Sequence, residues 1–340
     1  MALRIVQRHI IDMHSHYYGD SLVKYLMSRD EPPFIRKTSA GLYTFTTHSG
    51  TSPFDIGYTS LEERQNFMRY RDIKKQIITF PGSLGIDYYS VDIKTTEAII
   101  GSNNDMINAM NISEASFECL AGIPMFDLAL SIAEYKRTRQ LGCLGLILPA
   151  IAVSSQNNIE LYADLFSAVN DDHGHILLHP APVISANIKD TTKQGGFHWI
   201  NESVFNLMDQ VARSLVSLIK YKFVDSYPNI SWQLIALGGS FVFSYERIKS
   251  IINERNVEKI EIATIPKQIF FDTSSMGTKN IEYFTSYYGT SNIILGSDYP
   301  IFLGLDKSLI ENSELLTSQD MKNIMHENAD RIIRKCKQYG

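Results

Sequence analysis

Eight short apolar segments, separated by longer stretches of helical periodicity, constrain the fold of this 340-residue chain more than any other feature. The segments are rich in β-branched or aromatic residues and are bounded by Gly, Pro, Asn or Asp, a pattern typical of strands buried on both faces. They span residues 8–16, 74–82, 117–125, 143–150, 175–182, 231–239, 267–275 and 292–300. Strands that alternate with helices pair in parallel, because a long crossover must return the chain to the same end of the sheet.

The stretches between the segments favour helices. In residues 126–142, Leu128, Ile132 and Tyr135 fall on one stripe, and Lys and Arg residues precede Gly142, as at many helix ends. Comparable stretches span residues 158–174, 203–228 and 317–336. Eight such βα units predict a (β/α)8 barrel of the TIM type, and a doubly wound open sheet is the alternative.

Residues 30–60 do not follow this alternation. Their sequence GLYTFTTHSGTSPFDIGYT predicts a small β-hairpin or loop, inserted after the first helix as a cap over the barrel mouth. The chain has no repeat, no low-complexity tract and no Pro- or Ser-rich linker. We therefore expect residues 1–340 to form a single barrel domain.

Composition excludes several classes of protein. A net charge of −5, without a block of basic residues, argues against a nucleic-acid partner. Three cysteines are too few for a disulfide framework, and Cys119 and Cys143 are expected to be small core residues. The sequence shows neither a signal peptide nor an apolar run of about 18 residues, so we expect a cytoplasmic protein without a membrane partner.

Polar side chains gather where three of the predicted strands end. His14 and His16 follow the first strand, His179 follows the fifth, and Asp298 follows the eighth. Residues i and i+2 of an extended chain point to the same side, so both imidazoles of the HxH pair can reach one point at the barrel mouth. Three imidazoles and a carboxylate suit one divalent ion, with Zn²⁺ expected and Mn²⁺ as the alternative.

Several motifs resemble the amidohydrolase-related family, and in particular its branch of 2-amino-3-carboxymuconate-6-semialdehyde decarboxylases. They are DMHSHYYG, the His-Pro step at 179–180, GGSF, FFDTSS, ILGSDYPIFLG and ENADRII, which occur in the family's order from residue 9 to 335. The resemblance implies a metal-bearing (β/α)8 barrel and a homodimer. It also matches His14, His16, His179 and Asp298 to the family's metal ligands.

The chain departs from the family pattern after the sixth strand. Relatives carry a His there that assists proton transfer, whereas this chain has Ala236. Losing a positioned acid or base typically lowers a rate by about 10²–10⁴-fold unless another group replaces it. His198 is the preferred replacement in the loop after the fifth strand, ahead of Lys189 and Lys193.

Two further residues match substrate-binding positions of relatives. Arg247 corresponds to an Arg that binds a substrate carboxylate, sometimes across a dimer interface, and a guanidinium can bind a carboxylate through two hydrogen bonds. The alternative is a helix-surface Arg paired with an acid such as Glu246. Trp199 resembles an aromatic residue of the substrate pocket, and Asp272 is expected to orient a loop or a ligating His.

The preferred function is therefore a metal-dependent, non-oxidative decarboxylase of a small carboxylated substrate that is unsaturated or aromatic. One alternative is a hydrolase or hydratase that uses metal-activated water, with Asp298 as the base. The other is a catalytically reduced member of the family that binds a metabolite.

Overall fold

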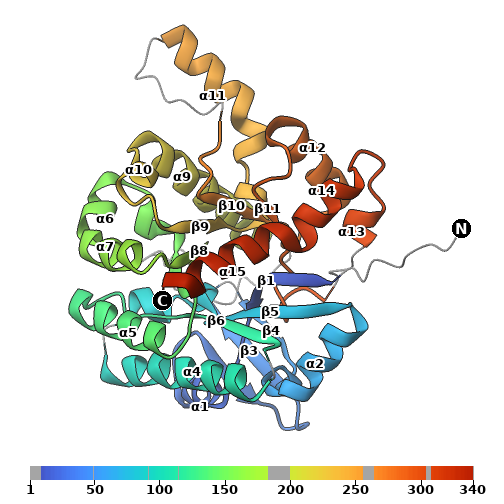
Figure 1. Ribbon diagram of the computed structural model, residues 1–340. Helices are drawn as coiled ribbons and strands as arrows, with labels where there is room; N and C mark the ends of the chain where they lie inside the picture. Colours follow the sequence, from blue (N-terminus) through green and yellow to red (C-terminus); the bar gives the residue numbers. More distant parts are fainter. Residues whose placement is uncertain are drawn as a thin grey trace, which may run out of the picture.

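The computed structural model describes residues 9–48, 50–90, 92–113, 115–182, 200–255, 264–303 and 308–339 of the protein. Its main sheet contains eight parallel strands, each paired with the next (Figure 1). In sheet order they are β1 (Ile10–His16), β5 (Ile73–Thr79), β6 (Phe117–Ala121), β7 (Gly145–Pro149), β8 (His175–His179), β9 (Ser231–Leu234), β10 (Ile269–Asp272) and β11 (Ile293–Ile294). Every segment predicted as a strand overlaps one of them, with β5 starting one residue before its segment, so the predicted alternation is confirmed.

The sheet closes on itself between β1 and the segment that follows β11. The backbone N–H of Met13 donates to the carbonyl of Leu295 at 2.8 Å, and that of His16 donates to Tyr299 at 2.6 Å. A parallel bridge between Ser15 and Tyr299 continues this contact. The (β/α)8 barrel is thus confirmed and the open sheet is excluded.

Helices surround the strands (Figure 1). Their bounds are α1 (Asp20–Ser28), α2 (Leu61–Tyr70), α3 (Ile86–Tyr89), α4 (Ile93–Ile112), α5 (Leu128–Gln140), α6 (Gln156–Leu161), α7 (Ala163–Asp171), α9 (Leu207–Lys220), α10 (Phe223–Ser226), α11 (Phe241–Arg255), α12 (Thr278–Tyr288), α13 (Ser308–Glu311), α14 (Ser318–Lys322) and α15 (Asn328–Tyr339). Short 3₁₀ turns are η1 (Ile56–Thr59), η2 (Gly82–Leu84), η3 (Ala150–Val153) and η5 (Ala236–Gly238), and π-helical turns are η4 (Asn201–Asn206) and η6 (Asn323–Glu327).

Two predicted helical stretches are divided in the structure. Residues 158–174 contain the end of α6 and all of α7. Residues 203–228 contain α9 and α10. Lys222 lies between α9 and α10 with a φ of 51°, a left-handed conformation that a right-handed helix cannot contain. The periodicity therefore located the helical regions but not the breaks within them.

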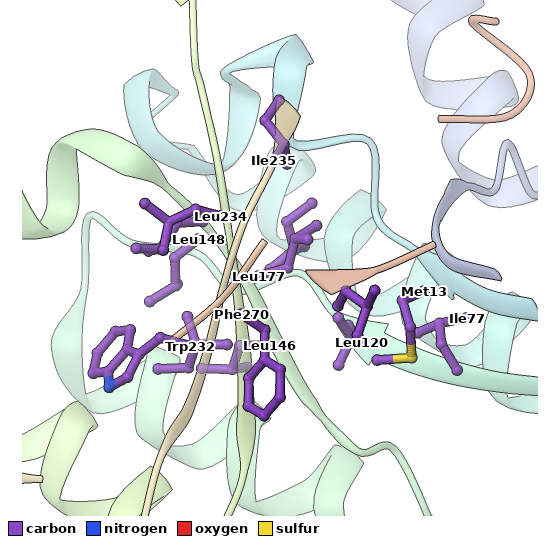
Figure 2. Packing of buried hydrophobic residues seen from close by; sticks show 14 of the residues in the cluster. Met13, Ile77, Leu120, Leu146, Leu148, Leu177, Trp232, Leu234, Ile235 and Phe270 are labelled. Atoms are coloured by element: carbon purple, nitrogen blue, oxygen red, sulfur yellow. The ribbon is translucent and has the colours of Figure 1, made fainter. Parts of the chain in front are cut away.

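The barrel strands are buried along most of their length, and the surrounding helices add further residues to the same core. Figure 2 shows this packing where β7, β8 and β9 run side by side, with Leu146, Leu177 and Trp232 among the labelled residues. All three are fully buried. Burial of apolar side chains on neighbouring strands is the main term that holds the barrel together.

The insertion after the first helix is a three-stranded antiparallel sheet, one strand more than the predicted hairpin. It consists of β2 (Phe34–Lys37), β3 (Tyr43–Thr47) and β4 (Gly50–Phe54). Phe45 and Phe54 pack edge-on against Tyr18, which lies two residues after β1. The small sheet therefore sits beside the carboxyl end of the first barrel strand.

The cysteines differ in part from expectation. Cys119 and Cys143 are fully buried, as predicted, but they form a disulfide between β6 and the segment that precedes β7. This pairing was not predicted, because residues 24 positions apart come into contact only when neighbouring strands align. Cys336 is a buried free thiol. In the described residues, no helix is long and apolar enough to cross a membrane.

Candidate metal centre

The four predicted metal ligands converge at the carboxyl-terminal end of the barrel. His14 and His16 lie on β1, His179 ends β8, and Asp298 follows β11. One ligand atom from each side chain lies within 4.8 Å of every other, and all four residues are buried. Nε2 of His16 is 3.1 Å from Oδ1 of Asp298, and Nε2 of His14 is 3.6 Å from the same oxygen. The structure thus places together what the strand-end analysis predicted.

Each imidazole is held by a contact through its other ring nitrogen. Nδ1 of His14 lies 3.0 Å from a carboxylate oxygen of Asp272, and Nδ1 of His16 lies 3.0 Å from the hydroxyl of Thr79. Nδ1 of His179 lies 2.8 Å from the carbonyl of Pro180, which can only accept. With Nδ1 donating, Nε2 of each ring keeps a lone pair for a cation, which is how metal-binding histidines are usually oriented.

The buried ligand atoms of the site fit a bound cation. Nε2 of His14, Nε2 of His16 and Oδ1 of Asp298 are buried, yet none has a hydrogen-bond partner among the described residues. Buried polar atoms without partners are costly, so each such atom requires an explanation. A divalent ion bound by the three imidazoles and the carboxylate would supply the missing contacts.

The charges of the site favour a cation. Burial opposes charge on His14, but the carboxylates of Asp272 and Asp298 outweigh it and raise its pKa to about 9. Burial and the two neighbouring imidazoles lower the pKa of His179 to about 3. Burial would also raise the pKa of Asp298, but His14 and His16 more than offset it. With the three imidazoles neutral, as binding through Nε2 requires, the carboxylates of Asp272 and Asp298 leave net negative charge for a metal ion to balance.

Glycine permits the close approach of the elements that carry the ligands. A Cβ atom on Gly296 would lie 2.9 Å from Cβ of His14 and 3.0 Å from Cβ of Asp272. Real Cβ atoms do not approach so closely, so a larger residue would push the end of β11 away from β1. This glycine precedes Asp298 by two positions and so fixes the approach of the carboxylate ligand.

A chain of hydrogen bonds supports Asp272 from inside the barrel. Nε2 of Gln233 donates to Asp272 at 2.7 Å, and Oε1 of Gln233 pairs with Nε2 of His175 at 2.8 Å. The expectation that Asp272 orients a ligating His is met by its contact with His14. The supporting residues Thr79 and Gln233 were missed, because a Thr or Gln in a strand carries no sequence signal of its own.

Ala236 occupies the place where a His was expected from the family pattern. It follows β9, is buried, and donates its backbone N–H to Asp272 at 3.1 Å. Its backbone is left-handed, with a φ of 50°. The suggested replacements His198, Lys189 and Lys193, and the pocket candidate Trp199, lie outside the described residues.

Arg247 is exposed on α11, a helix that extends away from the barrel (Figure 1). The structure does not bring it together with the four metal ligands of the same chain. Close to it, the exposed ring of Phe243 stacks on Tyr283 of α12 at 5.0 Å, and Tyr287 lies beside Tyr283. Substrate binding by Arg247 therefore stays a prediction, in which this Arg would reach the site of a second chain.

Known proteins match this chain in structure but not in sequence. No family model and no curated protein matches the sequence. Solved structures do match. A Metarhizium anisopliae IDCase has a TM-score of 0.80 at 16% identity, with 98% of this chain and 99% of that chain covered. A 5-carboxyvanillate decarboxylase from Novosphingobium aromaticivorans, solved with manganese and 4-hydroxy-3-methoxy-5-nitrobenzoic acid, has a TM-score of 0.73 at 16% identity, with 97% of each chain covered.

A 2,6-dihydroxybenzoate decarboxylase from Rhizobium has a TM-score of 0.71 at 14% identity, with 96% of this chain and 99% of that chain covered. The matches extend over almost the whole of each chain. At these identities the comparisons establish the fold. The chain thus has the (β/α)8 barrel fold of these solved structures.

Proposed function

We propose that the protein is a metal-dependent, non-oxidative decarboxylase of a small aromatic or unsaturated carboxylic acid. The observation that carries the proposal is the convergence of His14, His16, His179 and Asp298, with unpartnered buried ligand atoms, at the end of the barrel where such enzymes have their active sites. The structural neighbours named as decarboxylases support the same activity.

The four side chains would hold one divalent ion, Zn²⁺ by their chemistry, with Mn²⁺ as the alternative. Two neighbours were solved with manganese. The chemistry that such an ion supplies when bound is Lewis-acid polarisation of a substrate oxygen. The imidazoles are fixed before any ligand arrives, because each one is held through Nδ1.

Asp298 is the residue of the four that substrate can reach. Its side chain is 12% exposed, whereas the side chains of His14 and His16 are 0% and 1% exposed. In decarboxylation the bond between the carboxylate carbon and its neighbour breaks, CO₂ leaves, and the neighbouring carbon takes a proton. We assign movement of that proton to Asp298, with His198 as a second proton-transfer residue.

The cap contributes to water exclusion on the same side of the barrel. Phe45 and Phe54 cover Tyr18, and Tyr18 is buried with its pKa raised above the ordinary range by burial and by Asp298. Excluding water strengthens the electrostatic interactions between a charged substrate and the site.

Substrate binding by Arg247 and Trp199, and a homodimer, complete the proposal. Arg247 is exposed beside the aromatic cluster of Phe243, Tyr283 and Tyr287, which supports a contact with a second chain. Light scattering should then give twice the monomer mass. Replacement of Arg247 by Ala should raise KM for a carboxylate substrate more than it lowers kcat.

The function is tested by loading the purified protein with Zn²⁺ or Mn²⁺ and offering hydroxybenzoates, carboxyvanillates and unsaturated carboxylates. We expect CO₂ release, and in D₂O one deuterium on the carbon that lost the carboxylate. The His179→Ala variant is the control and should release no CO₂. Addition of water to the substrate would support a hydrolase or hydratase instead, and tight binding without turnover would support a metabolite-binding protein.

A further inference from the structure

A second group of metal-ligating side chains lies at the opposite end of the barrel. His9 precedes β1, His326 lies in the π-helical turn η6, and Asp330 lies in the first turns of α15. One ligand atom from each residue lies within 4.8 Å of the other two. The two imidazoles stack with centroids 4.4 Å apart, and Nε2 of His9 lies 3.9 Å from a carboxylate oxygen of Asp330.

The local structure explains why these residues face one another. His326 and Asp330 are four positions apart on one continuous helical segment, so their side chains lie on the same side of it. Within that segment, the carbonyl of Ile324 accepts the backbone N–H of Leu295, and Asn328 donates to the carbonyls of Thr290 and Ile293. These bonds fix the helix to the β11 region. The cluster therefore stands on ordered backbone.

The surroundings leave the ligand atoms accessible. The three residues line an open cavity of about 940 Å³, together with residues such as His173 and Asn229 that precede β8 and β9. All three are partly exposed, so modest side-chain rotations can bring the ligand atoms to a common ion.

Basic side chains also line the cavity, so an anion is the alternative ligand to a metal ion. Arg331 donates to the carbonyl of Ser291 at 2.7 Å and lies over the ring of Phe270, and Arg334 donates to the carbonyl of Asp330. The third cation of the lining, Lys335, contacts the hydroxyl of Ser231 at 3.4 Å. Both guanidinium groups are thus engaged with protein groups. The carboxylate of Asp330 would repel an anion at the imidazoles, so the cluster itself favours a cation.

We propose that His9, His326 and Asp330 form a second site for a divalent transition-metal ion, distinct from the centre at the barrel mouth. Two imidazoles and one carboxylate suit Zn²⁺, and the remaining coordination positions would face the cavity. The ion would join the start of the first strand to the C-terminal helix. These elements flank the seam at which the barrel closes, so the second ion would stabilise that closure.

The test measures zinc binding in a background that lacks the first centre. The metal-free His16→Ala protein is titrated with Zn²⁺, and we expect one equivalent to bind and to raise Tm. Adding His326→Ala should abolish both effects. His173→Asn is the matched control, since His173 lines the same cavity but stacks on Tyr339 outside the cluster. Asn also tolerates the left-handed backbone at that position, where φ is 51°.

Retention of the zinc equivalent in the His326→Ala protein would overturn the proposal, as would equal losses in the His326→Ala and His173→Asn proteins. Asp330→Asn provides an independent variant in case His326→Ala does not fold, and it should weaken zinc binding without changing the circular dichroism spectrum. In the protein with an intact His16, His326→Ala should keep its activity toward carboxylates. The second site and the proposed function can therefore fail separately.

Discussion

The two ends of the barrel carry similar ligand sets in opposite physical settings. At the carboxyl-terminal end the imidazoles of His14, His16 and His179 are buried, and each is fixed through its second nitrogen. At the amino-terminal end the imidazoles of His9 and His326 are partly exposed beside an open cavity. The first setting holds ligands in place before an ion arrives, and the second leaves them free to adjust.

The two settings indicate what burial contributes to a metal centre. A buried ligand without its ion leaves polar atoms unsatisfied, so ion binding and local stability are strongly coupled. An exposed ligand without its ion is solvated by water and loses little. Variants at the carboxyl-terminal end should therefore have larger effects than variants at the amino-terminal end.

The largest effect is expected from His179→Ala. Loss of one of four ligands should prevent tight metal binding, and several kcal/mol of Lewis-acid stabilisation corresponds to roughly 10³-fold or more in rate. Metal content by mass spectrometry and CO₂ release check both parts. Full metal occupancy in the variant would contradict the assigned ligand set, and His173→Asn serves as a control at the other end of the barrel.

A smaller effect is expected from Asp272→Asn. The amide keeps the shape of the side chain but removes the negative charge that faces Nδ1 of His14. Changes of this kind typically weaken metal affinity by about 10–100-fold. Competition with a chelator measures the affinity, and unchanged affinity would show that Asp272 supports the fold alone.

The carboxyl-terminal end of the barrel also contains a buried acid whose carboxylate is only partly hydrogen-bonded. Asp87, on α3 after β5, is fully buried, and one of its carboxylate oxygens has no hydrogen-bond partner among the described residues. Burial raises its pKa from 3.8 to about 7. Between these values the unfolded chain loses the proton while the folded chain keeps it, so stability falls as pH rises, at up to about 1.4 kcal/mol per unit.

Replacement of Asp87 by Asn should remove this dependence of the folding stability on pH. We expect the variant to equal the parent in stability near pH 4 and to exceed it by roughly 1–3 kcal/mol above pH 7. Urea unfolding at several pH values measures the difference. A gain that does not change with pH would show that titration of the carboxyl group is not its cause.

The smallest effect is expected from Thr79→Val. The substitution preserves shape but removes the hydroxyl that contacts Nδ1 of His16. The net free-energy contribution of a hydrogen bond is about 1 kcal/mol, so loss of this one should lower metal affinity about fivefold. Thr79→Ser should restore most of it, and equal affinities of the Val and Ser variants would exclude a role for the hydroxyl.

The same contrast shows how far sequence reasoning extends. The metal ligands at the barrel mouth were predictable, because parallel strands of a barrel end at one face and the motif around Asp298 was recognisable. His9, His326 and Asp330 were not, because they belong to no motif and meet only after the C-terminal helix packs beside β1. Thr79 and Gln233 act through hydrogen bonds that depend on atomic positions within the strands.

The disulfide and the third cap strand were missed for related reasons. Cys119 and Cys143 meet across neighbouring strands, and only the alignment of β6 and β7 brings their sulfurs into contact. In the cap, three of the five residues of β4 are exposed and one of these is Pro53, so alternation of apolar residues did not reveal it. Backbone pairing with β3 stabilises it instead.

The seam between β1 and the segment after β11 has a consequence for how the protein matures. Two imidazoles of the proposed centre belong to the first strand of the barrel and the carboxylate follows the last, so a nascent chain emerging from the ribosome carries every histidine of the set long before Asp298 is translated. Assembly of the full ligand set must then await translation of Asp298 and closure of the barrel. Binding of the ion by all four side chains would report, in a cell, that the barrel has closed.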